Sequence, residues 1–392
     1  MMAIVLCLVC FGVVMVYSAT SAQAVLAGTS PFAFVEKQVL YAGIGVAAFV
    51  LCRRWDPRFL QRIAGLGMVA SIGALFVVLV PGIGVEVNGA RRWVSFPLLG
   101  QIQPAEFAKL TLVLWIAAAV ARDPRRLMTF KGLLPYLMVT FLMAGLVLAE
   151  PDLGTATTLV FVAFAMLLVA GAKPRHIFAA MAAAGVVAGI AIAAAPYRRA
   201  RLLAFLDPWH QATGNGFQTV QAQIAVGSGG LHGVGLGAGL QKAFYLPEAH
   251  TDMILASIGE ELGFIGICGV LAALGAVVLL AFRIAMRAPD LHQRLIATGL
   301  AALIAVQSLD NAGAALGVMP ITGVPLPFIS YGGSSLIVLL ASMGLLFSIS
   351  RRSHRASRKQ STTDAGTDRS QRDGRARDAG ARRRGSAARA NG

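Results

Sequence analysis

The chain has 392 residues, of which 57% are hydrophobic and only 13% are charged, and its formal net charge is +16. A mean hydropathy of +0.70 lies far above the range of soluble globular domains. Four cysteines, scattered along the chain, predict neither a disulfide framework nor a zinc site. The sequence also lacks the GxxxxGK[ST], HExxH and GxSxG motifs, so ATP-driven pumping has no support.

Ten apolar stretches follow one another, and with their polar flanks they reach or approach the roughly 20 residues that cross a bilayer. They are residues 1–17, 39–51, 63–80, 110–120, 133–148, 153–170, 177–195, 253–282, 295–309 and 336–349. The predicted fold class is therefore all-α, a polytopic integral membrane protein of about ten transmembrane helices. One large extracytoplasmic loop, residues 197–250, is expected between spans seven and eight.

The basic residues predict the orientation, because short cytoplasmic loops collect arginine and lysine. With the N-terminus inside, most basic residues of the membrane region fall in the inner loops, although the longest loop lies outside. These inner residues are Arg53, Arg54, Arg58, Arg62, Arg122, Arg125, Arg126, Lys131, Lys173, Arg175, Arg283, Arg287 and Arg294. Both termini are therefore expected in the cytoplasm, and the chain in the cytoplasmic membrane.

Residues 1–350 form the predicted membrane domain, and residues 351–392 a separate tail. The tail is rich in Arg, Ser, Ala, Asp and Gly and has no apolar periodicity, so it is expected to be disordered and cytoplasmic. Its basic residues are expected to meet anionic lipid of the inner leaflet. Nucleic acid is not an expected partner.

Three carboxylates mark the stretch 241–266, which runs from a polar loop into an apolar helix. Asp252 lies at the mouth of this helix, while Glu260 and Glu261 lie roughly 12 Å deeper. Ionisable groups at membrane depth are candidates for a functional site. At most one glutamate can share a cavity with Asp252, so both are expected to pack against polar groups of other spans. A carboxylate that only stabilises a helix N-terminus is the alternative for Asp252.

The loop 197–250 carries arginines that contradict the positive-inside trend, namely Arg198, Arg199 and Arg201. Arginine suits bidentate phosphate recognition, although contact with lipid headgroups is the alternative. Seven glycines between Gly227 and Gly239 allow backbone to approach backbone in a re-entrant turn, or to approach a ligand.

Further polar groups are expected on the outer side, which favours an outward-facing polar cavity. Glu106 and Lys109 are three residues apart on one helix face, where they can form a structural ion pair. His250 is a candidate proton shuttle or metal ligand, although a structural hydrogen-bond partner is favoured. The other outer groups are Arg91 and Arg92, Asp152, and the Pro- and Gly-rich segment 320–335; Asp310 and Asn311 are expected to bond across helices.

Seven motifs carry a family resemblance. NGARRW, QPAEFAKL, EPDLGT, YRRARLLAFLDP, YLPEAHTD, EELGFIG and LPFISYGGSS occur in this order. Together they resemble the SEDS family (shape, elongation, division and sporulation) of bacterial wall proteins, over roughly residues 12–350. QKAFYLPEAHTD and DPW resemble the FtsW-like branch, whereas MPITGVPLPFISYGG is closer to the RodA-like branch; the first similarity carries more weight.

The resemblance implies a peptidoglycan glycosyltransferase that polymerises lipid II. Such an enzyme joins the glycan, held by undecaprenyl pyrophosphate, to the 4-hydroxyl of an incoming lipid II sugar. Asp252 matches the essential aspartate of the family's HTD motif. The substrate-binding residues are expected among Arg91, Arg92, Glu106, Lys109, Asp152, Arg198, Arg201, Lys242 and His250. The chain departs from the family pattern at Ala105, where serine is usual, and at Glu150, where glutamine is usual.

The chemistry agrees with the role of Asp252. A sugar hydroxyl is a poor nucleophile, and a positioned carboxylate can act as its general base. The leaving pyrophosphate needs positive charge from arginine, lysine or a divalent cation such as Mg²⁺ or Mn²⁺. The sequence leaves the metal requirement open, and no organic cofactor is expected.

Two other functions fit a polar cavity in a membrane protein. One is a lipid II flippase, which would place its site near the bilayer midplane on broken helices. The other is a non-catalytic scaffold for a transpeptidase. The resemblance also implies partners: a class B penicillin-binding protein and other proteins of the division machinery.

Overall fold

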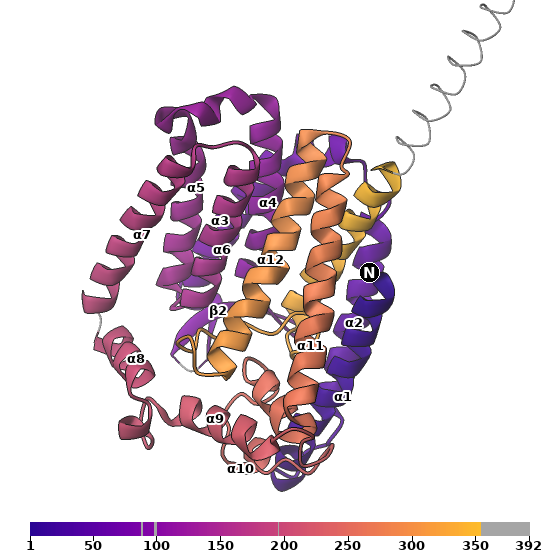
Figure 1. Ribbon diagram of the computed structural model, residues 1–392, viewed down its shortest axis with the longest axis vertical. Coiled ribbons are helices and arrows are strands. Elements are labelled where there is room, and N and C mark those ends of the chain that lie inside the picture. Colours follow the sequence, from indigo (N-terminus) through magenta and orange to yellow (C-terminus); the bar gives the residue numbers. More distant parts are fainter. Residues whose placement is uncertain (88, 98–99, 195, 354–392) are drawn as a thin grey trace, which may run out of the picture.

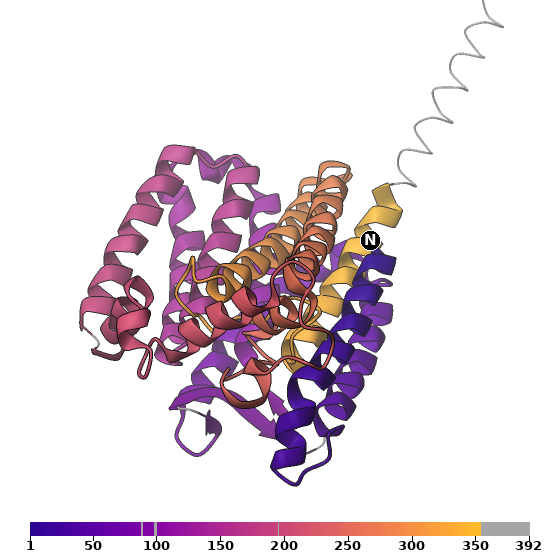
Figure 2. The same cartoon turned by 60° about the horizontal axis from the view of Figure 1, so that its bottom comes forward.

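The computed structural model describes residues 1–87, 89–97, 100–194 and 196–353, and over this range it is a bundle of long helices (Figure 1). A layer of short helices covers one end of the bundle (Figure 2). The long helices are α1 (Met2–Leu26), α2 (Ala33–Cys52), α3 (Pro57–Leu79), α4 (Pro104–Arg122), α5 (Phe130–Ala149), α6 (Leu153–Val169), α7 (Pro174–Ala194), α11 (Ile254–Met286), α12 (Leu291–Ala315) and a last helix, Gly333–Ser353.

The ten long helices coincide with the ten predicted spans, which confirms the polytopic helical fold. Within the described residues, nine of them are long and apolar enough to cross a membrane. The tenth, α6, is apolar and has 17 residues. Large apolar side chains such as Leu66 and Val69 of α3 are 74% and 69% exposed, as expected where lipid is the solvent.

Local sequence sets where the helices begin. The Asp56 carboxylate accepts the backbone N–H of Arg58 at 2.9 Å, and Pro57 occupies the first turn of α3. Asp152 caps α6 in the same way by accepting the Thr155 N–H at 3.0 Å. An N-cap carboxylate satisfies backbone donors that the helix itself leaves without a partner.

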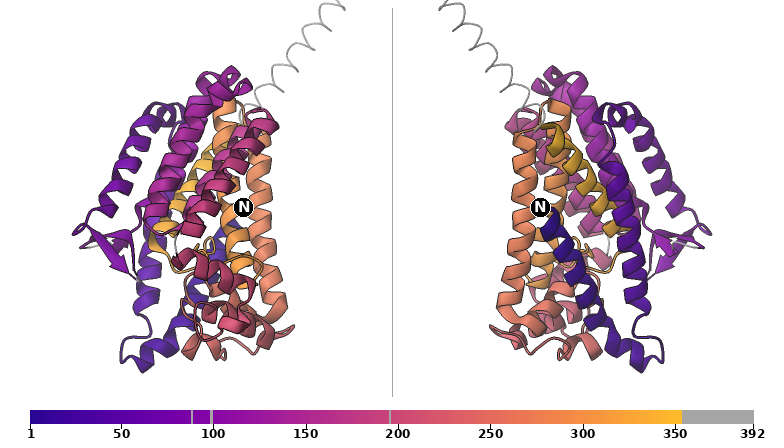
Figure 3. Two further views of the ribbon diagram at one scale, coloured as in Figure 1. Left: turned by 90° about the vertical axis from the view of Figure 1, so that its left-hand side faces the viewer. Right: turned by 90° about the vertical axis from the view of Figure 1, so that its right-hand side faces the viewer.

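A small antiparallel sheet, β1 (Gly84–Val87), β2 (Ala90–Phe96) and β3 (Gly100–Ile102), lies at the end of α3 (Figure 3). The Asn-Gly dipeptide between β1 and β2 is typical of a two-residue hairpin turn. Val87 pairs directly with Ala90 across it.

The predicted outer loop 197–250 is mostly structured rather than open. It contains α8 (Pro196–Leu206), the 3₁₀ turn η2 (Trp209–Gln211), α9 (Phe217–Gly229) and α10 (Gln241–Phe244). Helix α9 packs across α11, whereas α8 packs beneath α7 at the edge of the bundle (Figure 1). A second 3₁₀ turn, η1 (Pro124–Met128), joins α4 to α5 at the opposite end.

Helix α11 is broken at Gly263, whose backbone angles are φ 68° and ψ −165°. The glycine-rich loop after α9 fills the break. The Gly230 carbonyl accepts the Phe264 N–H at 2.8 Å, and the Val234 N–H donates to the Glu260 carbonyl at 2.9 Å. These bonds satisfy backbone groups that a broken membrane helix cannot leave exposed to lipid. The close approach of backbone to backbone expected from the glycines is thus present, on α11.

Candidate active site

The segment 320–334, which runs from beyond α12 into the first turn of the last helix, connects several polar groups at the end of the bundle that carries the short helices. Asn311 of α12 donates from Nδ2 to the Val324 carbonyl at 2.9 Å and to the Asp252 carbonyl at 2.7 Å. Thr322 donates to Asp310 at 2.7 Å. Asp310 and Asn311 were expected to bond across helices, but their partners here lie outside the helices, and Asn311 holds Asp252 and segment 320–334 together.

Asp252 lies two residues before the start of α11, at the end of the bundle that carries the short helices. It is 8% exposed, and the Thr251 hydroxyl lies 3.4 Å from its Oδ1. Because Asn311 binds the Asp252 main chain, the carboxylate stands on a fixed backbone. A sheltered, positioned carboxylate of this kind is suited to general-base chemistry.

His250 packs between two aromatic rings and serves as a structural residue here. Its ring centroid lies 4.9 Å from that of Phe34 and 5.6 Å from that of Tyr331, whose N–H donates to the His250 carbonyl at 2.9 Å. Burial lowers the pKa of His250 below its ordinary value, against an opposing effect of Glu248. A neutral imidazole supplies no positive charge to a pyrophosphate at neutral pH.

Glu106 and Lys109 form the ion pair considered for them. Lys109 Nζ lies 2.7 Å from Glu106 Oε1, and the two side chains are 3% exposed or less. The second carboxylate oxygen of Glu106 has no hydrogen-bond partner among the described residues. The pair therefore places two charges, which neutralise one another, on the buried face of α4.

Asp152 is connected to the last helix through Gln103. Gln103 donates from Nε2 to Asp152 Oδ2 at 3.1 Å, and its backbone N–H donates to Ser334 Oγ at 3.0 Å. Asp152 is 3% exposed. The starts of α4 and α6 are thereby tied to the start of the last helix.

The two arginines of β2 differ in their surroundings. Arg91 forms an exposed ion pair with Glu86 of β1 at 2.9 Å. Arg92 points towards the turn after α5, donating to the Glu150 carbonyl at 3.1 Å and to the Pro151 carbonyl. Arg92 thus stabilises backbone carbonyls at the end of a helix, an arrangement that the sequence analysis did not anticipate.

Lys242 lies apart from Asp252, inside the protein. Its ammonium donates to Ser18 Oγ of α1 at 2.6 Å and to Glu261 Oε1 of α11, and its side chain is 3% exposed. A substrate contact was expected of Lys242, but this arrangement commits it to a structural ion pair. Glu260 is also used within the chain, since it accepts the backbone N–H groups of Leu240 and Gln241 at 2.7 and 3.0 Å.

Glu150, one of the two departures from the family pattern, is a buried carboxyl. It is fully buried, and neither carboxylate oxygen has a hydrogen-bond partner among the described residues. Burial raises the pKa of Glu150 to about 8, Asp152 adds to the rise, and Arg92 opposes it. Glu150 is therefore protonated at neutral pH, when its shape and polarity approach those of glutamine.

Arg198 and Arg201 were expected near a pyrophosphate. Their backbone lies in α8, which packs beneath α7, while their side chains lie outside the described part of the structure. The tail beyond Ser353 also lies outside the described residues. Within the described ranges, no group of three or more His, Cys, Asp and Glu is placed to hold a metal ion.

Comparison with known proteins identifies the family. The sequence profile of the cell cycle proteins FtsW, RodA and SpoVE matches residues 1–355. The chain belongs to the FtsW, RodA and SpoVE family. It is 40% identical over 346 residues to a probable peptidoglycan glycosyltransferase FtsW of Geobacter metallireducens, covering 88% of this chain and 92% of the relative. It is 39% identical over 350 residues to the stage V sporulation protein E of Bacillus subtilis, covering 89% and 95%.

Solved structures of the family share the fold. A chain of a peptidoglycan synthase complex that coordinates polymerization and crosslinking aligns with a TM-score of 0.74 and 33% identity, over 90% of this chain and 97% of that chain. The rod shape determining protein RodA of Thermus thermophilus aligns with a TM-score of 0.66 and 31% identity, over 89% and 95%. These similarities support the FtsW-like assignment and the multi-pass membrane architecture.

Proposed function

We propose that this protein is a peptidoglycan glycosyltransferase that polymerises lipid II on the outer face of the cytoplasmic membrane. The observation that carries the proposal is the position of Asp252, a sheltered carboxylate whose main chain Asn311 fixes to segment 320–334. The family membership supports it, because relatives covering most of this chain bear the name peptidoglycan glycosyltransferase.

Asp252 acts as the general base. The 4-hydroxyl of the incoming lipid II sugar attacks the anomeric carbon of the glycan, Asp252 takes the hydroxyl proton, and the polyprenyl pyrophosphate leaves with the electron pair of the broken C–O bond. A well-placed base contributes roughly 10²–10⁴-fold to such a step. Binding at one end of the bundle leaves the polyprenyl chain in the lipid beside the apolar surfaces of the helices.

The pyrophosphate needs positive charge, and the described arginine and lysine side chains are largely engaged elsewhere. Lys109 is neutralised by Glu106, Lys242 by Glu261, and Arg92 binds main-chain carbonyls. Arg198 and Arg201 of α8 remain the proposed pyrophosphate contacts. A bound Mg²⁺ or Mn²⁺ would supply further positive charge to the leaving pyrophosphate.

Lipid II polymerisation by the purified protein tests the proposal. The Asp252→Asn variant is expected to give no glycan ladder from labelled lipid II, while its thermal unfolding matches that of the wild type. Glu86→Gln, which changes an exposed carboxylate of β1, is the matched control and is expected to retain full activity. An Asp252→Asn protein that polymerises lipid II at the wild-type rate would exclude this role for Asp252.

One observation favours a flippase as a second candidate, namely the break of α11 at Gly263. Transporters commonly bind their cargo at broken helices. In this chain the loop 230–235 occupies the break and bonds its freed backbone groups, so the break offers no such group to a cargo. Reconstituted vesicles with labelled lipid II separate the possibilities: ladders indicate a polymerase, movement without ladders a flippase, and neither a scaffold.

The proposal also covers the partner protein and the orientation of the chain in the membrane. One structural relative is a chain of a peptidoglycan synthase complex that coordinates polymerization and crosslinking. This relative supports a class B penicillin-binding protein as the transpeptidase partner. FtsW-like relatives support a place among the division proteins. The distribution of arginine and lysine supports cytoplasmic termini, with the end that carries Asp252 outside.

A further inference from the structure

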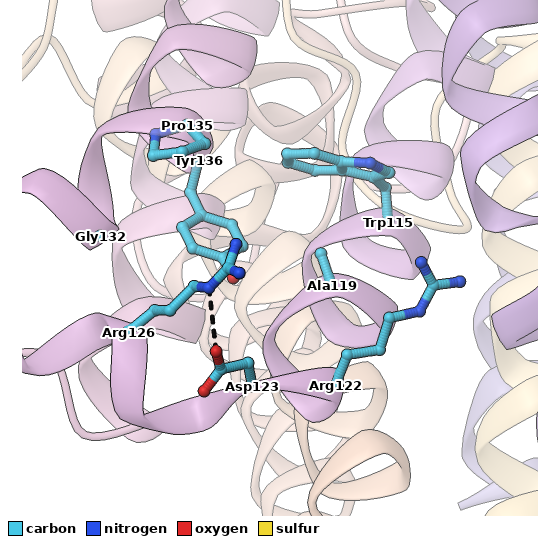
Figure 4. Close-up of a pocket in the computed structure, with 8 residues that line it drawn as sticks. All are labelled: Trp115, Ala119, Arg122, Asp123, Arg126, Gly132, Pro135 and Tyr136. Carbon is cyan, nitrogen blue, oxygen red and sulfur yellow. Dashed lines mark hydrogen bonds and ion pairs between the residues drawn. The ribbon is translucent and has the colours of Figure 1, made fainter.

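A pocket lies at the end of the bundle opposite to Asp252, between α4, η1 and α5 (Figure 4). Its volume is about 300 Å³. Its lining residues are Trp115, Ala119, Arg122, Asp123, Arg126, Gly132, Pro135 and Tyr136. The proposed polymerase chemistry uses none of them.

The pocket joins an aromatic wall to a cationic rim. Trp115 of α4 and Tyr136 of α5 face one another, with ring centroids 5.8 Å apart. Arg122 and Arg126 lie on the two sides of the α4–η1 connection; the guanidinium group of Arg126 lies beside Tyr136, and that of Arg122 lies further out, on the side of Trp115 (Figure 4). Asp123 is the one acidic residue among the lining residues, so the rim carries a net positive charge.

Both arginines keep donors for a ligand. Arg126 pairs with Asp123 through Nε at 2.9 Å, and no contact among the described residues engages its two terminal nitrogens. Arg122 makes only a 3.5 Å contact, from Nη2 to the Gln61 carbonyl, and forms no ion pair within the described part of the chain. Each guanidinium group thus offers open donors of the kind that bind a phosphate group.

The surroundings place this site at the edge of a bilayer. Large apolar side chains of η1 and α5 lie exposed next to the pocket, namely Met128, Phe130, Leu134 and Met138, which are 43–63% exposed. Tryptophan and tyrosine are typical of the membrane–water interface, where one end of the ring is apolar and the other is wet. A ligand of this pocket therefore carries an apolar part beside an anionic one.

We propose that this pocket binds the headgroup of an anionic phospholipid from the leaflet opposite to Asp252, with Arg126 at its phosphate beside Tyr136, Arg122 adding positive charge at the rim, and its acyl chains along Leu134 and Met138. The volume is at the small end of ligand pockets, which suits a headgroup rather than a whole lipid. Basic pockets between helices at the cytoplasmic side are a known means of holding anionic headgroups. The proposal does not depend on the activity at Asp252.

Tryptophan quenching tests it directly, because Trp115 lies in the pocket and two turns deeper than Arg122. The full chain is placed in phosphatidylcholine nanodiscs that contain increasing fractions of phosphatidylglycerol with brominated acyl chains. The signal of Trp115 is the difference between the wild type and Trp115→Phe. Brominated phosphatidylglycerol is expected to quench it at a lower mole fraction than brominated phosphatidylcholine; equal quenching by the two lipids overturns the proposal.

Substitutions test whether Arg122 and Arg126 cause the preference for the anionic lipid. Arg122→Ala/Arg126→Ala is expected to lower the preference roughly tenfold for each arginine removed, since a hydrogen bond to a charged group contributes about 1.5 kcal/mol or more. Arg125→Ala/Lys131→Ala removes two exposed charges of the same region that do not line the pocket, and is expected to keep the preference. An equal loss in both double variants would indicate general surface charge and overturn the site.

Two further measurements complete the test. Arg122→Lys/Arg126→Lys keeps the charges and is expected to retain most of the preference, so the proposal stays testable if the alanine variant does not fold. Inorganic phosphate at millimolar concentration is expected to leave the quenching unchanged. Displacement by inorganic phosphate would mean that the pocket binds a soluble anion, and the lipid proposal would be wrong.

Discussion

Lys242 and Glu261 form an ion pair inside the protein, with side chains 3% and 0% exposed, although 19 residues separate them in the chain. The pair holds α10 against α11. Ser18 completes it by accepting from Lys242 and donating to both Glu261 oxygens at 2.7 and 2.8 Å. The N-terminal helix α1, the short helix α10 and the broken helix α11 are therefore held at one point.

Removing one partner of this pair is expected to destabilise the fold strongly. Lys242→Met leaves the Glu261 carboxylate buried without its cation, a change that costs on the order of 3–5 kcal/mol. The double variant Lys242→Met/Glu261→Leu leaves no unpaired charge and is expected to lose less than the sum of the single variants. Thermal unfolding in detergent measures both. Additive losses would show that the two charges are not coupled.

The break in α11 is expected to require glycine at position 263. Its φ of 68° with ψ of −165° is open almost only to glycine, and a Cβ there would lie 2.4 Å from the Gly233 backbone nitrogen. Gly263→Ala is expected to lower stability by at least about 1–3 kcal/mol. Gly269→Ala in the same helix meets open space and is expected to be neutral or slightly stabilising. Equal unfolding temperatures for the two variants would contradict the broken helix.

Glu150 predicts a dependence of stability on pH. Its pKa rises from 4.5 to about 8 on folding, so between these values the folded state holds a proton that the unfolded state releases. Stability is therefore expected to fall as pH rises through this interval, with the loss complete above about pH 8. Glu150→Gln is expected to remove this fall and to keep polymerase activity.

The control for Glu150 is Glu36→Gln, which changes an exposed carboxyl in the first turn of α2. Thermal midpoints measured from acid to mildly alkaline pH compare the two variants with the wild type. The slope is expected to change only for Glu150→Gln. An unchanged slope in that variant would rule out a protonated Glu150.

Asn311 is expected to be a positioning residue for Asp252. Asn311→Ala removes the bonds to the Asp252 and Val324 carbonyls, and a displacement of about 1 Å at a reacting group can cost roughly 100-fold in rate. The expected result is a large loss of kcat with a small change in KM. Ser308→Ala, one turn earlier in α12, removes only a bond within the helix and is the control. A loss of stability in Asn311→Ala that matched its loss of rate would point to a merely structural role.

The spans could be predicted because a membrane helix must bond its backbone internally and face lipid with apolar side chains, so each leaves a local apolar run. The break in α11 left no such mark, since Gly263 and Gly269 look alike within one run. Only the fold of the distant loop 230–235 distinguishes them.

The candidate site shows the same division between local and distant information. Asp252 was identifiable from its charge beside an apolar helix, and Glu106 and Lys109 from their spacing of three residues. The partners of Lys242 and Arg92 were not, because α1, α11 and the turn after α5 are far away in the sequence. The pyrophosphate contact expected of the loop arginines Arg198 and Arg201 stays a prediction.

Segment 320–334 lies close to the C-terminal end of the membrane region, yet the residues that it joins lie earlier. Asn311, Gln103 and His250 all bond to this segment or to the start of the last helix. During synthesis these earlier residues leave the ribosome before the segment to which they will bond has been made. A chain interrupted before residue 320 therefore has all its proposed catalytic groups but no assembled centre, so incomplete products in the membrane are expected to be inert.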